Sequence, residues 1–419
     1  MVKTQYPIIK VIPDNKFKTA AICLMLRRPL KRDEATKNAL LANVLGAGSD
    51  KYPGIYEISK YMEELYGATF GCIVVKKGEF QIIRLYIEFA STMDDMLITQ
   101  AVEFLHEILF NPLTEGGGFL KEIFDNERNM LADAISERIN DKNSYARLKC
   151  VENMCKDEAF GIYADGYAKD LEGLDPEALY RHYEEVLRTT PLEFIASGNI
   201  DGAEFEKLVA QTFKSDLSNP ITWSIGPAVY KPGPARTYEE VLKVNQSKIC
   251  IGLRAGCGYL GKPYYSLLVL NEVLGGSGSS KLFVNLREKA SLCYSVFSFI
   301  FRVKSILMIQ SGVETDNIDI AIEKINEQVK ALKDGQITGE ELYLAKQSLI
   351  SGFKGITDSQ GGVLEFSYSR HILGDSDGID DIIKGIEGVS VQEIAALAGS
   401  LYTDTIYILK GDKEGEEDE

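Results

Sequence analysis

Histidine is the scarcest reactive residue in this sequence, with only three among 419 residues. His106, His182 and His371 lie far apart, and no two share the i, i+4 spacing that places two metal ligands on one helix face. This absence excludes a histidine-based zinc site of the H-E-x-x-H type within the chain. His106 lies among apolar residues in AVEFLHEILF, so we expect it at the edge of a core or on the surface.

Positive charge is also in short supply. The chain has 46 Lys and Arg against 62 Asp and Glu, a net charge of −16. Phosphate binding needs a basic surface, which argues against nucleic acid as a partner. A basic peptide or protein partner is compatible with this charge, although solubility alone also explains it. Some of the charge lies in the last residues, KEGEEDE, which we expect to form a solvated acidic tail at 413–419.

Long apolar runs and a cysteine framework are missing as well. No run approaches the roughly 18 apolar residues that a membrane span needs, and the start, MVKTQYPIIKVIPDN, has no apolar segment after its first lysine. We therefore expect a cytoplasmic protein that does not enter a membrane. The seven cysteines are scattered through apolar segments such as AAICLML, which predicts reduced core residues. Cys150 and Cys155 have no second pair near them in sequence, so their spacing gives little support for a metal site.

An internal repeat is the strongest architectural signal. ALLANVLGAGS in the first half is answered by LLVLNEVLGGSGS in the second, and three further segments recur in the same order. The number of residues that separates matched positions falls along the chain, since Leu45 corresponds to Leu274 and Leu174 to Val389. The second copy therefore has shorter loops. We predict two homologous α+β domains, at 1–215 and 236–412, joined by a proline-rich linker at 216–235.

Local patterns predict the elements of the first domain. Strands near 7–11 and 17–28 read as a pair turning at Asp14-Asn15, and Asp33 is expected to cap a helix that Gly46 closes. The runs TFGCIVV and FQIIRLYIEFA read as a hairpin. Amphipathic helices follow at about 94–109, 119–140 and 175–187, and the strand PLEFIASG precedes a last helix.

The segment LGGSGSSKLFVNLREKASLCY, residues 274–294, joins a glycine-rich turn at Gly275, Gly276 and Gly278 to a helix. A P-loop is not supported, because serine rather than glycine precedes the lysine. A glycine hinge beside a peptide cleft fits the residues equally well. Arg287 and Tyr294 are seven positions apart, so both side chains can reach one cleft, although an ordinary loop, helix and strand would also have this spacing.

The repeat and its two motifs, LGGSGSSKLFVNLREKASLCYSV and ALLANVLGAGSDKYPGIYEISKYMEELYGATF, resemble the M16 metallopeptidases, the family of pitrilysin, insulinase and the mitochondrial processing peptidase. The resemblance covers nearly the whole chain. It implies the LuxS/MPP-like metallohydrolase fold, in which each domain is a mostly antiparallel sheet covered by helices. It also implies that two such chains enclose a peptide chamber.

The resemblance further implies that the zinc site has been lost. Active members carry H-x-x-E-H on the first helix, where two histidines bind zinc and the glutamate acts as general base. These positions are Ala39, Ala42 and Asn43 in this sequence. The remaining ligand, a glutamate seven residues after another glutamate, corresponds to Ala134, and the earlier glutamate is kept as Glu127. We expect no bound metal or other cofactor, and no peptide hydrolysis by this chain alone.

The second copy departs less from the family. Active members use an arginine and a tyrosine of a C-terminal domain to hold substrate and stabilise the tetrahedral intermediate, and Arg287 and Tyr294 fall on those positions. In two-chain members such a pair can reach the partner's zinc site.

The resulting hypothesis is a non-catalytic subunit of a heterodimeric M16-type peptidase, with a zinc-bearing M16 chain as partner and a peptide or unfolded protein as substrate. The alternative is a peptide-binding or scaffolding protein without a role in catalysis, and whether the isolated chain forms a homodimer stays open. The first half is most similar to the zinc-free member of a bacterial pair associated with elongation factor P modification, which leaves that role open too.

Overall fold

The computed structural model describes residues 7–91, 93–94, 96–214, 217, 220–222, 224–225 and 231–412. The predicted acidic tail and much of the predicted linker lie outside these residues. The chain divides into two compact units. Unit 1 comprises Met1–Glu137, Ile162–Ser224 and Asp358–Ser369, and unit 2 comprises Arg138–Gly161, Ile225–Thr357 and Arg370–Glu419. Each unit therefore includes one segment from the other half of the sequence.

Unit 1 is built on a five-stranded sheet in the order β1-β7-β2-β4-β3. All neighbours run antiparallel except the parallel pair β1 and β7. The strands are β1 (Ile8–Pro13), β2 (Ala20–Pro29), β3 (Thr69–Lys77), β4 (Phe80–Phe89) and β7 (Leu192–Gly198), and a small ribbon is formed by β5 (Thr114–Glu115) and β6 (Gly118–Phe119).

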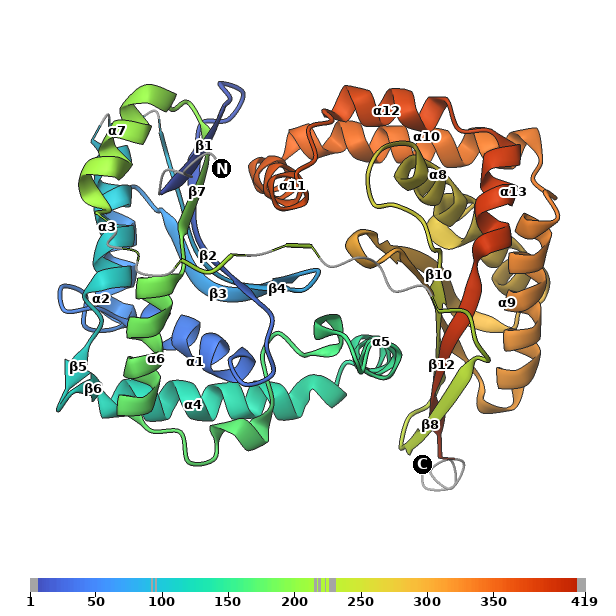
Figure 1. Ribbon diagram of the computed structural model, residues 1–419, viewed down its shortest axis with the longest axis horizontal. Helices are drawn as coiled ribbons and strands as arrows, with labels where there is room; N and C mark the ends of the chain where they lie inside the picture. The colour runs from blue at the N-terminus through green and yellow to red at the C-terminus, as the bar shows by residue number, and fades with distance from the viewer. Residues whose placement is uncertain are drawn as a thin grey trace. The chain divides into compact units, whose positions relative to one another are not determined.

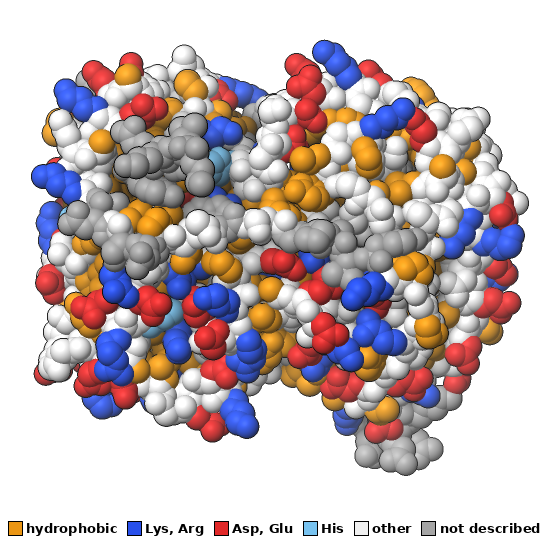
Figure 2. Space-filling model, in the orientation of Figure 1, with side chains coloured by type: hydrophobic (Ala, Val, Ile, Leu, Met, Phe, Trp, Pro, Cys, Tyr) orange, Lys and Arg blue, Asp and Glu red, His pale blue; other side chains and the backbone are white. Residues whose placement is uncertain are grey.

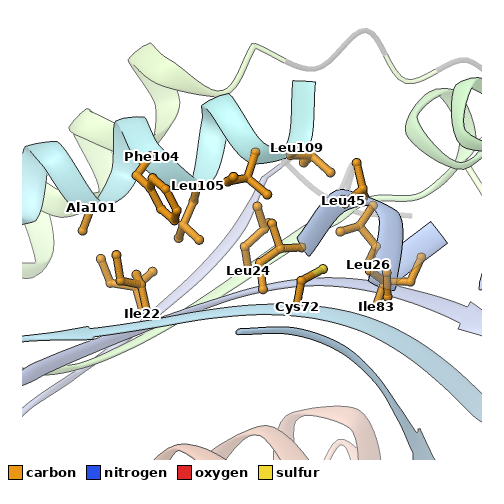
Figure 3. Packing of buried hydrophobic residues seen from close by; sticks show 14 of the residues in the cluster. Ile22, Leu24, Leu26, Leu45, Cys72, Ile83, Ala101, Phe104, Leu105 and Leu109 are labelled. Carbon is orange, nitrogen blue, oxygen red and sulfur yellow. The ribbon is translucent and has the colours of Figure 1, made fainter. Parts of the chain in front are cut away.

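Helices cover one face of this sheet and enclose the main core (Figure 1). They are α1 (Ala35–Ala47), α2 (Ile55–Glu64), α3 (Leu97–Phe110), α4 (Lys121–Ser136), α6 (Pro176–Thr189) and α7 (Gly202–Thr212). Figure 3 shows Ile22 and Leu24 of β2 pointing toward α3, whereas Leu26 lies beside Leu45 of α1. Each such fully buried side chain contributes roughly 1.5–3 kcal/mol of burial free energy, so this layer holds the unit together.

The opposite face of the same sheet is also covered. The first seven residues of β2, 20–26, are apolar on both faces of the strand, and the first nine residues are all buried. Alternation sends Cys23 and Met25 away from the core of Figure 3, toward the part of α11 (Gln360–Leu373) that belongs to unit 1. Gln360 at the start of α11 donates to the carbonyl oxygen of Ser197 at 2.7 Å, which fixes the helix to β7.

Unit 2 repeats this topology. Its sheet has the order β10-β11-β9-β12-β8, again antiparallel except for one parallel pair, β12 and β8. The strands are β8 (Arg236–Leu242), β9 (Ser247–Arg254), β10 (Cys293–Phe301), β11 (Ile306–Val313) and β12 (Tyr402–Gly411). The helices are α5 (Lys142–Met154), α8 (Gly261–Asn271), α9 (Ile318–Lys333), α10 (Gly339–Gly355), α12 (Ile379–Glu387) and α13 (Val391–Ser400). Two segments, η4 (Glu272–Gly276) and η5 (Phe283–Lys289), are π-helical.

Helix α5 comes from the first half of the sequence but packs on the sheet of unit 2. Its Cys150 and Met154 share a buried cluster with Cys250, Met308 and Tyr407 from three strands of that sheet. Figure 1 shows α5 on one side of this sheet and α9 on the other. A second tie comes from Arg254 of β9, which donates to the carbonyl oxygen of Met154 at 3.1 Å.

The predicted fold class is confirmed, with corrections in detail. The strands at the start of the chain do not form a hairpin, because β7 lies between β1 and β2. The N-cap of α1 is Glu34 rather than Asp33, and the helix continues through Gly46 to Ala47. The predicted hairpin of β3 and β4 is correct, with Gly78 at φ 58° in its turn.

Two predictions from composition can be compared with the structure. All seven cysteines are free thiols, and six of them are buried. No helix among the described residues has the length and apolarity needed to cross a membrane. On the face drawn in Figure 2, acidic and basic side chains are interspersed, and no large basic patch is present on that face.

Candidate functional site

The positions of the family's zinc motif lie on α1, which packs against β3 and α4. Ala39 and Ala42 are 1% and 0% exposed and belong to the core of unit 1, whereas Asn43 is half-buried. The methyl groups of Ala39 and Ala42 fill space in the core and offer no lone pair to a metal ion. The helix that carries the motif in active relatives therefore serves packing in this chain.

The fourth ligand position lies on α4. Ala134 is exposed there, and Glu127, two turns earlier, is half-buried. Burial raises the pKa of the Glu127 carboxyl above its ordinary value. With alanine at two of the three ligand positions, only the Asn43 amide remains there, and one amide does not fit Zn²⁺, which needs three or four nitrogen, sulfur or oxygen ligands. Among the described residues, no three His, Cys, Asp or Glu side chains are grouped so that they could hold a metal ion.

A buried polar network lies beside these positions, and no pattern in the sequence predicted it. Gln81 of β4 donates to the carbonyl oxygens of Ala35 and Ala164, so its own oxygen accepts from Asn38 Nδ2 at 2.8 Å. The Asn38 oxygen then faces His182 Nε2 at 2.8 Å, which requires the proton on Nε2. Burial, aided by the charge of Arg28, lowers the pKa of His182 to about 4. These hydrogen bonds connect α1 to β4 and α6, and the His182 imidazole that takes part in them is neutral.

The glycine-rich segment of unit 2 is more ordered than a simple turn. Gly275 and Gly276 end the π-helix η4, and only Gly278 lies in the connection that follows. A Cβ on Gly275 would lie 2.8 Å from the backbone nitrogen of Ser298 on β10, whereas one on Gly278 would meet nothing within 4 Å. Gly275 therefore allows η4 to approach β10 closely, and Gly278 does not have this role.

Arg287 lies in the last turn of the π-helix η5 and is exposed. Its guanidinium carbon is 4.8 Å from the centroid of the Phe283 ring, one turn earlier. This cation–π contact holds the guanidinium against its own helix. π-helical turns are rare and are frequent at functional sites, because the wider turn changes where side chains point. The guanidinium is thus held at the surface with its donors accessible.

Tyr294 lies at a β-bulge at the start of β10. Cys293 pairs with Val313 and Ser295 with Gly312, so Tyr294 is the extra residue on its strand. A bulge redirects a side chain and interrupts strand pairing, and here the tyrosine is 56% exposed. Its hydroxyl donates to Glu314 Oε1 at 3.2 Å.

The elements that carry Arg287 and Tyr294, η5 and β10, pack against each other in unit 2. Burial raises the pKa of the Cys293 thiol, which precedes Tyr294, while a hydrogen bond with Ser311 and the charge of Arg287 oppose that shift. Together Arg287 and Tyr294 offer a guanidinium and a phenol hydroxyl, both donors suited to a carbonyl or oxyanion. Glu314 was not singled out by sequence reasoning as part of this site, since an exposed glutamate after a strand carries no signal of its own.

Comparisons with known proteins agree with this architecture. Residues 173–349 match the model described as "Peptidase M16 inactive domain". A protein of Bacillus subtilis, the "Probable inactive metalloprotease YmfF", is 30% identical over 405 residues, covering 96% of this chain and 95% of the relative. The "Uncharacterized zinc protease YmxG" of the same organism is 23% identical, covering 90% of this chain and 94% of the relative.

Solved structures show the same fold. A conserved protein from Enterococcus faecalis V583 superimposes with a TM-score of 0.91 at 26% identity, covering 97% of each chain. A peptidase M16 inactive domain from Pseudomonas fluorescens has a TM-score of 0.76 at 14% identity, covering 96% of each chain.

The fold and the missing metal ligands define a protein of the zinc metallopeptidase class whose own first domain holds no zinc motif. The chain belongs to the peptidase M16 family. The resemblance deduced from the two motifs is thereby confirmed.

Proposed function

We propose that this chain is the non-catalytic subunit of a two-chain M16-type zinc peptidase of the cytoplasm. A partner chain with an intact H-x-x-E-H motif would supply zinc and the general base. This chain would form half of the peptide chamber and contribute Arg287 and Tyr294 to the partner's zinc site.

One contrast carries the proposal. The zinc-motif positions Ala39 and Ala42 have become part of a core, while Arg287 and Tyr294 stay exposed on two irregular elements, a π-helix and a β-bulge. Irregular backbone of this kind lacks regular hydrogen-bond pairing, so it is retained where a side chain has to point in a particular direction. Both donors stay exposed although each has one contact within unit 2, Arg287 with the Phe283 ring and Tyr294 with Glu314.

The chemistry expected of the pair follows from its donors. A tetrahedral intermediate carries negative charge on the former carbonyl oxygen, and a guanidinium and a hydroxyl donate hydrogen bonds to that charge. Removal of one donor to an oxyanion costs about 10²–10³ in kcat in a well-studied hydrolase, so a large effect on turnover is expected of each residue.

The test is reconstitution with a zinc-bearing M16 chain from the same genome. Cleavage of a quenched fluorescent peptide is measured for each chain alone and for the mixture, together with zinc content. We expect cleavage only in the mixture, and a strong loss with Arg287→Ala or Tyr294→Phe. Lys289→Ala, which removes a neighbouring exposed cation of η5, serves as the matched control and should leave turnover unchanged.

The scaffolding alternative predicts a different result. If the mixture forms a stable complex but cleaves equally well with Arg287→Ala and Tyr294→Phe, the chain shapes the assembly without contributing to catalysis. Stoichiometric zinc in the purified chain would contradict both hypotheses.

A further inference from the structure

A second site lies on the face of the unit 1 sheet that points away from the core of Figure 3. A cavity of about 180 Å³ opens there between strands β2, β3 and β4 and the part of α11 that belongs to unit 1. Cys23, Met25 and Val75 form an apolar wall, while Lys77, Arg84 and Glu365 supply charge. The strand residues share one face, since Arg84 pairs directly with Met25 across β2 and β4.

The charges in this cavity do not balance. Lys77 of β3 forms an ion pair with Glu365 of α11, and Ser369 supports it from the same helix. Arg84 Nη1 lies 3.9 Å from Glu365, beyond hydrogen-bond distance. With two cations and one carboxylate, the lining carries one positive charge in excess.

The guanidinium of Arg84 also has an unused donor. Its Nε–H is buried and has no hydrogen-bond partner among the described residues. A buried donor without an acceptor destabilises the fold, and more so when the group is charged. The strand could relieve this cost with any neutral side chain of similar size, so the arginine calls for an acceptor that the chain itself does not supply.

We propose that this cavity binds a monocarboxylate that carries a small apolar group. The planar guanidinium of Arg84 would take the carboxylate through two parallel hydrogen bonds, a geometry that carboxylates match well. The wall formed by Cys23, Met25 and Val75 would take the apolar group. This size and chemistry fit either a small organic acid or the C-terminal residue of a peptide, and the site is independent of the function proposed for Arg287 and Tyr294.

The experiment measures binding of defined probes to the full chain by isothermal titration calorimetry. The probes are N-acetyl-leucine, N-acetyl-leucinamide, and one leucine-terminated pentapeptide with a free or an amidated C-terminus. We expect the carboxylates to bind and the neutral amides not to bind. Binding of both acids identifies a peptide end as an acceptable ligand, and binding of N-acetyl-leucine alone identifies a small organic acid.

Variants assign the binding to this cavity. Arg84→Met keeps the apolar stem, so we expect it to fold and to lose about tenfold or more in affinity. Glu365→Gln removes the competing carboxylate and should bind the same acid more tightly, a gain that general damage to the fold could not produce. Lys289→Ala, which removes an exposed cation in unit 2, is the control and should bind like the parent chain.

The proposal is wrong if the amides bind as tightly as the acids, if none of the probes binds at about 1 mM, or if Arg84→Met retains the parent affinity. Melting temperatures of all variants establish that each is folded. Because no partner chain or peptidase assay is involved, failure here leaves the proposed catalytic role intact, and failure of the reconstitution leaves this site intact.

Discussion

The hydroxyl of Tyr294 donates a hydrogen bond to the carboxylate of Glu314, with 3.2 Å between Oη and Oε1. Tyr294 is the extra residue of the bulge in β10, and Glu314 directly follows β11. A phenol has one hydrogen to donate. Glu314 therefore accepts the one hydroxyl hydrogen of Tyr294 that the proposed function assigns to a substrate oxygen.

The first prediction concerns this competition. Glu314→Ala should raise turnover of the reconstituted peptidase by about threefold, because an exposed hydrogen bond is worth roughly 0.5–1 kcal/mol and its loss frees the hydroxyl. The kcat of the mixture is the measurement. In the Tyr294→Phe background the same substitution should have no effect, and an equal rise there would show that Glu314 acts through something other than the tyrosine.

The second prediction separates the glycines of the segment before η5. Gly275→Ala should destabilise the chain by about 1–3 kcal/mol, because its Cβ would press on the backbone of β10. Gly278→Ala, where a Cβ meets open space, should change the unfolding free energy by less than about 0.5 kcal/mol. Urea unfolding of both variants tests this, and equal losses would contradict the close approach of η4 to β10.

The third prediction is a pH dependence of stability. His182 has a pKa of about 4 in the folded chain, below the ordinary value of 6.5, so the unfolded chain binds a proton first as the pH falls. Stability is therefore complete above about pH 6.5 and declines toward pH 4, by up to about 3 kcal/mol from this residue. Urea unfolding across that range is the measurement.

The matched variant for this prediction is His182→Gln. A glutamine amide can still donate to the Asn38 oxygen but does not titrate. The variant should lose less stability than the parent between about pH 6.5 and pH 4. Parallel curves for the two proteins would mean that His182 is not the group responsible.

The fourth prediction concerns the former zinc positions. Ala42→Glu should destabilise unit 1 by about 2 kcal/mol or more, because it places a carboxylate in a fully buried position without a partner. Asn43→His, at a half-buried position of the same helix, should cost less than about 1 kcal/mol. Thermal unfolding compares the two variants, and an unchanged stability for Ala42→Glu would indicate that the helix still has an open face there.

Much of the fold was predictable because the sequence repeats itself. The order of matched segments implied two similar domains, and the two sheets do share one strand order. The pairing of β1 with β7 was missed because it joins residues such as Ile9 and Phe194 that are far apart in sequence, while turn chemistry at Asp14 reports only on its neighbours. Local signals favour a hairpin wherever two strands flank a turn.

The sequence pointed to candidate residues for the site but not to their geometry. Spacing and family resemblance led to Arg287 and Tyr294, yet nothing local distinguishes a π-helix from an α-helix or marks Tyr294 as a bulge. The network of Asn38, Gln81 and His182 was missed for a related reason. Each member looks like an ordinary polar residue, and only the packing of α1, β4 and α6 brings them together.

Because α5 packs on the sheet of unit 2, cutting the chain between the two repeats would separate this helix from the strands it covers. A fragment ending before residue 216 would keep α5 but not β9, β11 and β12, leaving Cys150 and Met154 exposed to water. A fragment starting after residue 235 would lack the helix that covers Cys250 and Met308. The two copies of the repeat are thus interdependent for folding, so separate genes for each half would have to make products that assemble while incompletely folded.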